Sequence, residues 1–236
     1  MIINKVYHLA DLHIRNLQRH KEYRGVFKKF LKQVKEDKIE DSVIYIAGDI
    51  AHAKTEMSPE LVKEISWFLT ECAKLRETIL ITGNHDCNLN NSHRLDVLTP
   101  IIDNLQNPRI HYLRDTGVYN IHNLTFVVYS IMDNKENWPK GKDVEGENTI
   151  CVFHGPVNKA QTDIGYTVSS NSFQVDMFDG FDMAMLGDIH KRQTFGEGYE
   201  HIAYAGSMIQ QNHGELLENH GYLLWDIPTR TFTEHH

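Results

Sequence analysis

Four short segments combine acidic, amide and imidazole side chains with glycine at points where a predicted strand ends. They are Asp11-Leu12-His13, Gly48-Asp49, Gly83-Asn84-His85-Asp86 and Gly187-Asp188-Ile189-His190, and Phe153-His154-Gly155 is a fifth segment of the same kind. Carboxylate and amide oxygens mixed with imidazoles suit Mn²⁺, Fe²⁺ or Zn²⁺ better than a metal that prefers thiolates. Two such ions side by side are suited to hydrolysing a phosphate ester. These residue types therefore predict a dinuclear metal site for phosphoester hydrolysis.

The spacing inside the segments favours chelation. Residues two apart in a strand share a face, so Asp11 and His13 are a candidate pair of ligands, and Asp188 and His190 repeat that spacing. Taken singly, an aspartate after a strand usually caps a helix or stabilises a turn, and a lone histidine is usually a satisfied polar group. The shared placement of all the segments at strand ends makes a metal site the stronger interpretation.

The second and third segments add different chemistry. Asp49 follows a glycine that lets the backbone turn sharply, which leaves its carboxylate free to bridge two ions, and Asn84 offers a neutral amide oxygen. His85 is not needed as a ligand, so it is the candidate general acid that protonates the leaving alkoxide. Two interpretations of Asp86 stay open: it orients the His85 imidazole and favours its protonated form, or it stabilises the turn.

The elements that position these residues alternate between strand and helix in the first half of the chain. Strands are predicted over 2–9, 42–47 and 78–82, and helices over 22–35, from Pro59 with Ser58 as N-cap, and over 93–105. Strands separated by helices predict a parallel sheet with ligands at the carboxyl ends of its strands. The second half is rich in predicted strands, over 124–131, 149–153, 183–186, 202–204 and 222–227, with a long surface loop over 133–148. Together they predict one layered α/β sandwich domain.

Composition limits the function classes. The 236 residues suit one large domain, and a formal net charge of −8 argues against an extensive nucleic-acid-binding surface, although two bound cations would reverse the local sign. Three cysteines without paired spacing indicate reduced thiols and a cytoplasmic protein. The amino terminus is too soon interrupted by Asp11 to be a signal peptide, and no run is apolar enough to predict a membrane segment.

The order of the motifs resembles the calcineurin-like metallophosphoesterases over nearly the whole chain. Gly48-Asp49-Ile50-Ala51-His52, followed by Ser58-Pro59, and the segment from Ala203 to Gln211 are similar to SbcD-type nucleases, the Mre-eleven group, and most of all to the bacteriophage members. The resemblance implies an α/β/β/α sandwich and two divalent ions, most of all Mn²⁺, with Mg²⁺ as the alternative. It also implies DNA, a coiled-coil ATPase of the SbcC/Rad-fifty type and a second copy of the chain as partners.

The resemblance also implies a role for each matching residue. The first ion would be held by Asp11, His13, Asp49 and His190, and the second by Asp49, Asn84, His154 and Asp188. His85 would be the catalytic acid, and His52 a further active-site histidine near the scissile phosphate. From the sequence alone, His52 could equally be a loop residue that caps the next helix.

The chain departs from the family pattern in two respects. Asp188 stands where the family usually has a histidine, and its harder, charged oxygen favours Mn²⁺ or Mg²⁺ at the second site. The family's nuclease subunits continue into a capping domain and an ATPase-docking segment, which we expect this nuclease core, residues 1–236, to lack. Its own binding to DNA should then be weak.

A subunit contact is expected on the second helix. The helical period places Trp67 opposite Leu61, and the resemblance implies a dimer formed through this region, with Leu61 and Leu98 as supporting residues. The alternative is that Trp67 packs at the rim of the core. For the chain as a whole, the leading hypothesis is a DNA exonuclease and single-strand endonuclease in double-strand-break repair. A small-molecule phosphoesterase and a catalytically weak partner-binding scaffold are the alternatives.

Overall fold

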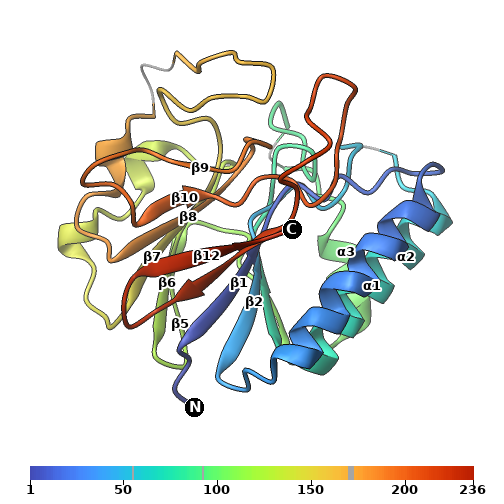
Figure 1. Ribbon diagram of the computed structural model, residues 1–236, viewed down its shortest axis with the longest axis horizontal. Helices are drawn as coiled ribbons and strands as arrows, with labels where there is room; N and C mark the ends of the chain where they lie inside the picture. The colour runs from blue at the N-terminus through green and yellow to red at the C-terminus, as the bar shows by residue number, and fades with distance from the viewer. Residues whose placement is uncertain (55, 92, 170–172) are drawn as a thin grey trace.

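Two six-stranded sheets lie face to face in the computed structural model, which describes residues 1–54, 56–91, 93–169 and 173–236 (Figure 1). In the first sheet, the parallel strands are β1 (Lys5–Leu9), β2 (Ser42–Ile46), β3 (Glu77–Leu80) and β4 (Ile110–Tyr112). Beyond β1 the sheet continues with two antiparallel strands, β11 (Tyr222–Asp226) and β12 (Thr231–His235).

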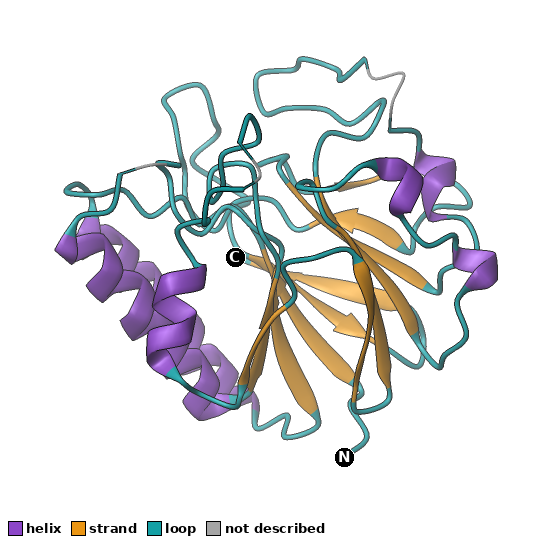
Figure 2. Ribbon diagram, turned by 180° about the vertical axis from the view of Figure 1, so that it is seen from behind, coloured by secondary structure: helices purple, strands orange, loops and turns teal. Residues whose placement is uncertain are grey.

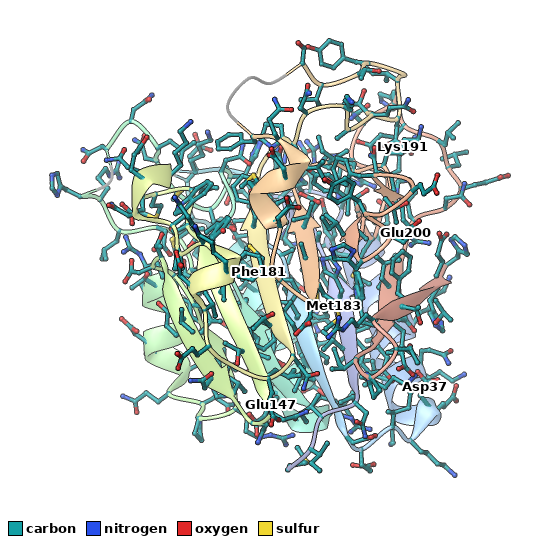
Figure 3. All side chains as sticks on the ribbon, turned by 90° about the vertical axis from the view of Figure 1, so that its left-hand side faces the viewer. Asp37, Glu147, Phe181, Met183, Lys191 and Glu200 are labelled. Atoms are coloured by element: carbon teal, nitrogen blue, oxygen red, sulfur yellow. The ribbon has the colours of Figure 1, made fainter. Side chains whose placement is uncertain are left out.

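The second sheet also has a parallel centre. Its central strands are β6 (Leu124–Tyr129), β7 (Thr149–His154), β8 (Met183–Gly187) and β10 (Ile202–Tyr204), and its antiparallel edges are β5 (Gly117–Ile121) and β9 (Gln193–Thr194). Figure 3 shows Met183 at the start of β8 and Lys191 above it, beyond the strand's carboxyl end. The last of the predicted motifs lies between these two residues, at that edge of the sheet.

Helices cover the outer face of the first sheet, whereas short 3₁₀ turns and loops cover the second (Figure 2). The helices are α1 (His20–Asp37), α2 (Pro59–Leu75) and α3 (Thr99–Leu105), and the turns are η1 (Lys135–Asn137), η2 (Gly141–Asp143) and η3 (Val175–Phe178). The predicted layered α/β sandwich is thereby confirmed. Its fourth layer consists of the three turns and their connecting loops.

Burial follows the predicted helical periodicity. Phe27 of α1 stacks on Phe68 of α2 with ring centroids 4.1 Å apart, and both belong to the core between the helices and the first sheet. A second core between the sheets contains Tyr45 and Trp225, and a third lies outside the second sheet. Ser58 caps α2 as predicted, since its hydroxyl accepts a hydrogen bond from the Leu61 N–H at 3.1 Å.

The prediction for the third helix was wrong over its first part, because α3 begins at Thr99 and not at 93. The Asp96 carboxylate accepts hydrogen bonds from the N–H groups of Leu98 and Thr99, and the Arg114 guanidinium pairs with it at 2.8 Å. These contacts hold a turn where periodicity alone indicated helix. Strands β4, β5, β9 and β12 were not predicted either.

Two of the three residues predicted for a subunit contact have no surface for one. Leu61 and Leu98 are completely buried in the core, so neither has surface with which to contact a partner. Trp67 is half-buried against the same core, with the Arg24 guanidinium 4.1 Å from its ring centre. Within the described part of the chain, no helix combines the length and the apolarity needed to cross a membrane.

Candidate metal centre

The predicted ligands come together at one edge of the molecule because each follows a strand whose carboxyl end points there. Asp11 follows β1, Asp49 follows β2 and Asn84 follows β3, while His154 ends β7 and Asp188 follows β8. Pairing of β1 with β2 and of β7 with β8 in parallel brings the ends together within each sheet, and the sandwich brings the two sheets' edges together. All seven predicted ligands thus belong to one cluster.

The first half of the cluster gathers Asp11, His13 and His190, whose ligand atoms lie within 4.8 Å of one another. The Nε2 atoms of His13 and His190 are 3.0 Å apart, and His13 Nε2 is 3.5 Å from Asp49 Oδ2. Spacings near 3 Å are those of neighbouring ligands around an ion with bonds of about 2.1 Å.

The second half surrounds His154. Its Nε2 lies 3.3 Å from Asp49 Oδ1, 3.0 Å from Asn84 Oδ1 and 3.8 Å from Asp188 Oδ1. Asp49 therefore directs one carboxylate oxygen toward each half, which is the geometry of a bridging ligand. The bridging role of Asp49 stays a prediction, and this geometry is compatible with it.

Hydrogen bonds on the far side of the two imidazoles fix their tautomers. His154 Nδ1 lies 2.6 Å from the Ala47 carbonyl, and His190 Nδ1 lies 2.7 Å from Glu215 Oε1. Because both partners only accept, each Nδ1 carries a proton, and each Nε2 faces the cluster as the atom available to a further proton or to a metal ion. Facing lone pairs and carboxylates repel one another unless a cation lies between them, so this donor set fits two divalent ions.

The electrostatics of the cluster agree with that conclusion. Burial opposes protonation of both imidazoles, but the Asp49 charge outweighs it and raises the pKa of His154 well above its ordinary value. Against the same burial penalty, the Glu215 hydrogen bond and the Asp11 charge raise the pKa of His190 to about 9. Burial raises the pKa of Asp11 to about 7. The cluster attracts positive charge, whether protons or metal ions.

The backbone is held in an uncommon conformation at four of the ligands. The φ angles of Asp11, His13, Asp49 and Asp188 are +53°, +46°, +50° and +97°, in a region that residues other than glycine rarely adopt. Such conformations persist only where the surrounding structure enforces them, and they concentrate at functional sites. Glycine is required at position 83 for a different reason, because a Cβ there would overlap the Asp49 carboxylate.

His85 lies beside the ligands with its ring oriented by the backbone. Its Nδ1 is 2.7 Å from the His52 carbonyl, so Nδ1 carries the proton and Nε2 is free for chemistry. The ring stands edge-on to His13 with centroids 4.8 Å apart. The His85 backbone N–H donates to Asp49 Oδ1 at 2.7 Å, which ties the candidate acid to the bridging ligand.

Asp86 does not orient the His85 imidazole, contrary to one of its two predicted roles. It is completely buried, and its carboxylate accepts hydrogen bonds from the N–H groups of Gly83, Ala51 and Ile50 at 2.9, 2.8 and 3.3 Å. Its place among the predicted catalytic residues is therefore corrected: Asp86 fastens the Asn84 turn to the segment after Asp49.

His52 lies inside the site, as predicted. Its ring stacks on that of His85 with centroids 5.4 Å apart, and one ligand atom from each of His13, His52 and His85 lies within 4.8 Å of the others. Burial, and then the positive charge of Arg15, lower the pKa of His52. A neutral imidazole is therefore favoured at this position.

Sequence reasoning missed Glu215. The Glu215 side chain is buried, and besides His190 it accepts hydrogen bonds from the Gln211 N–H at 2.6 Å and from Asn212 Nδ2 at 2.6 Å. Glu215 lies 25 residues after His190, and a separation of that length does not indicate that the two side chains are in contact. Only its place just beyond the segment that ends at Gln211 could have indicated a role.

Comparisons with known proteins agree with this geometry. The profile of the calcineurin-like phosphoesterase family matches residues 4–192. An uncharacterised protein of Acanthamoeba polyphaga mimivirus is 43% identical over 95% of this chain, which spans only 17% of that protein's length.

Two more distant relatives were found. A protein of Invertebrate iridescent virus 6 named as a phosphoesterase is 26% identical over 84% of this chain and 69% of its own length. The SbcD protein of the SbcCD nuclease of Staphylococcus epidermidis is 25% identical over 94% of this chain and 66% of its own length. The family match covers the ligand segments from Asp11 to His190 and agrees with the buried cluster that they form. The chain belongs to the calcineurin-like phosphoesterases.

Proposed function

We propose that this chain is the core of a dinuclear-metal DNA nuclease that hydrolyses phosphodiesters with Mn²⁺, as a double-strand exonuclease and a single-strand endonuclease. The observation that carries the proposal is the position of His85. Its Nδ1 proton is held by the His52 carbonyl, which leaves Nε2 free, and its ring stands edge-on to the proposed ligand His13 with centroids 4.8 Å apart. Ligands for two ions next to an oriented imidazole are what a phosphodiester needs for hydrolysis.

Each residue then has a defined task. Two bound divalent ions would be held by Asp11, His13, Asp49 and His190 and by Asp49, Asn84, His154 and Asp188, and would supply charge neutralisation and an acidified water. Protonated His85 would donate its Nε2 proton to the leaving oxygen. Its Nδ1–H···O contact with His52 keeps the ring in place during that transfer. General acids of this kind contribute about 10²–10⁴-fold to the rate.

DNA is favoured as the substrate by the segment from Ala203 to Gln211. This segment is one of those that resemble SbcD-type nucleases, and its hydrogen bonds hold the backbone next to the proposed metal ligands in place. The Ser207 N–H donates to the His190 carbonyl at 3.0 Å, and Gln211 Nε2 donates to the Leu12 carbonyl at 3.2 Å. The similarity to the SbcD protein of the SbcCD nuclease supports the same substrate.

The test compares wild type, His85→Gln and His111→Gln on end-labelled linear duplex DNA and on circular single-stranded DNA with Mn²⁺. His111 is a matched control, because it lies on β4 and pairs with Glu77 at 2.9 Å. Wild type and the control should release nucleotides, whereas His85→Gln should be slower by about 10²-fold or more. Cleavage of a small aromatic phosphodiester without cleavage of either DNA would replace the proposal with a small-molecule phosphoesterase.

The proposed biological setting is double-strand-break repair with a coiled-coil ATPase and a second copy of this chain. The net charge of −8 supports dependence on a partner for tight DNA binding. In the second copy's interface we place Trp67, whose ring is only partly covered by Arg24. Sedimentation of wild type and Trp67→Glu tests this contact: a dimer that dissociates in the variant supports it, and a monomeric wild type refutes it.

A further inference from the structure

A cavity of about 480 Å³ opens directly beside the second half of the metal cluster. Three of the proposed ligands, Asn84, His154 and Asp188, form one end of it. Aromatic rings line the same cavity, among them those of Trp138, Phe153 and Phe173. A molecule with a phosphate on the metal ligands would therefore have its neighbouring group against aromatic rings.

The aromatic wall is firmly built. The Trp138 indole stacks on Tyr129 with centroids 4.7 Å apart and planes 12° apart, and it meets Phe153 edge-on at 5.3 Å. Phe173 lies nearly parallel to Trp138, at 5.9 Å and 22°. The indole N–H donates to the Ser130 carbonyl at 3.3 Å, so the ring that lines the cavity is held in one orientation. Volume and lining are typical of a ligand site with mainly apolar walls and a few polar groups.

Charged residues line this cavity and a neighbouring one. Asp133, Lys135 and Glu136 line the first cavity, where two carboxylates to one ammonium disfavour a second phosphate. A neighbouring cavity of about 520 Å³, which shares Lys135 and Trp138 with the first, is lined by three lysines and two aspartates: Lys135, Lys140, Lys142, Asp176 and Asp179. The lysines outnumber the aspartates there, and aromatic side chains beside an excess of cationic groups are the combination with which proteins bind single-stranded nucleic acid.

We propose that the cavity beside Asn84, His154 and Asp188 is a nucleobase subsite, in which the base of the nucleotide that carries the scissile phosphate stacks against Trp138. This inference rests on the proposed function and specifies the substrate: a nucleotide whose base is unpaired, at a frayed end or in a single strand. Asp133 and Glu136 can accept hydrogen bonds from the amino groups of adenine, cytosine or guanine. The chain would then continue past Trp138 toward the three lysines.

Binding of product-like probes tests the subsite without relying on DNA cleavage. Calorimetry in Mn²⁺ compares 2′-deoxyadenosine 5′-monophosphate with 2-deoxyribose 5-phosphate, which lacks the base. Wild type should bind the nucleotide at least about tenfold more tightly, as expected for one stacked base. Trp138→Ala should lose this preference while binding the sugar phosphate as wild type does, and Trp138→Phe should retain part of it.

Tyr199→Leu is the matched control, since Tyr199 is a half-buried aromatic residue packed on the same core but outside this cavity. It should keep the full preference. Equal affinities of wild type for the two probes would contradict the proposed subsite. So would a folded Trp138→Ala that loses the same factor of affinity for both probes. A retained base preference in a protein that cleaves no DNA would overturn the proposed nuclease function alone.

The same subsite predicts a substrate effect on cleavage. In an oligonucleotide with one abasic residue, the bond at that residue should be cut about tenfold more slowly by wild type than the corresponding normal bond. Trp138→Ala should cut both at the slower rate. An abasic residue without effect on wild type contradicts the assignment.

Discussion

The Nδ1–H of His190 donates a hydrogen bond to Glu215 Oε1 across 2.7 Å, which joins the last metal motif to a loop that carries no recognisable ligand. Glu215 also receives hydrogen bonds from Asn212 and from Gln211, the last residue of the segment that resembles the SbcD-type nucleases. A carboxylate behind a metal-binding histidine sets the tautomer and raises the basicity of the ligand atom. We therefore expect Glu215 to position the His190 imidazole for metal binding.

Glu215→Gln should weaken Mn²⁺ binding by about 10–100-fold, because one amide oxygen cannot accept all the hydrogen bonds that the carboxylate accepts. Calorimetric titration with Mn²⁺ measures the loss, and excess Mn²⁺ should restore activity. The exposed Glu218→Gln is the control and should bind Mn²⁺ as wild type does. Unchanged affinity in Glu215→Gln would show that His190 needs no partner.

Asp86→Asn should lower the free energy of unfolding by about 2 kcal/mol. An asparagine amide cannot accept all three hydrogen bonds that the Asp86 carboxylate accepts from buried backbone N–H groups. Denaturant unfolding in the presence of EDTA measures this structural effect apart from metal binding. Asp103→Asn, on the exposed side of α3, should stay within about 0.5 kcal/mol of wild type. A fully stable Asp86→Asn with reduced cleavage would return Asp86 to the catalytic residues.

Asp188→His should reduce the affinity for Mn²⁺ and Mg²⁺ relative to Zn²⁺. Asp188 Oδ1 lies 3.8 Å from His154 Nε2, and its replacement removes one negative charge and one hard oxygen from the second half of the cluster. Competitive titrations with the three metals measure the order of affinities. An unchanged order would mean that Asp188 does not bind the ion.

His8 gives a pH dependence that is independent of the metal cluster. It is completely buried between the sheets, accepts a hydrogen bond from Trp225 Nε1 at 3.3 Å, and burial lowers its pKa from 6.5 to about 3. Between these values the unfolded chain binds a proton that the native protein does not. The free energy of unfolding therefore falls as the pH drops through this window, by up to about 1.4 kcal/mol per pH unit.

His8→Asn keeps an acceptor for Trp225 but does not titrate, so its stability should fall less steeply from pH 6.5 downward. Urea unfolding in EDTA at a series of pH values measures the two slopes. His201→Asn, on the half-buried rim of the second sheet, should retain the wild-type slope. Parallel curves for wild type and His8→Asn would contradict the assignment.

Several features followed from the sequence because their causes are local. The periodicity of α1 and α2 reflects one face that meets the core, and Ser58-Pro59 starts a helix through contacts within four residues. The ligand segments could be found because parallel strands place their carboxyl ends together, so a polar residue after each strand reaches the same edge. Asp11, Asp49, Asn84, His154 and Asp188 all follow this rule.

Contacts between distant segments decided the rest. The start of α3 depends on an ion pair between Asp96 and Arg114. These residues lie 18 positions apart in the sequence, so no local pattern reveals their pairing. The choice between two roles for Asp86 depended on the N–H groups of Ile50 and Ala51 from another strand's loop, and the tautomers of His154 and His190 on Ala47 and Glu215. The sequence by itself determined which side chains could bind metal. The tertiary structure decided which nitrogen of each imidazole carries the proton and which group accepts it, because folding brought hydrogen-bond partners from separate segments within about 3 Å of one another.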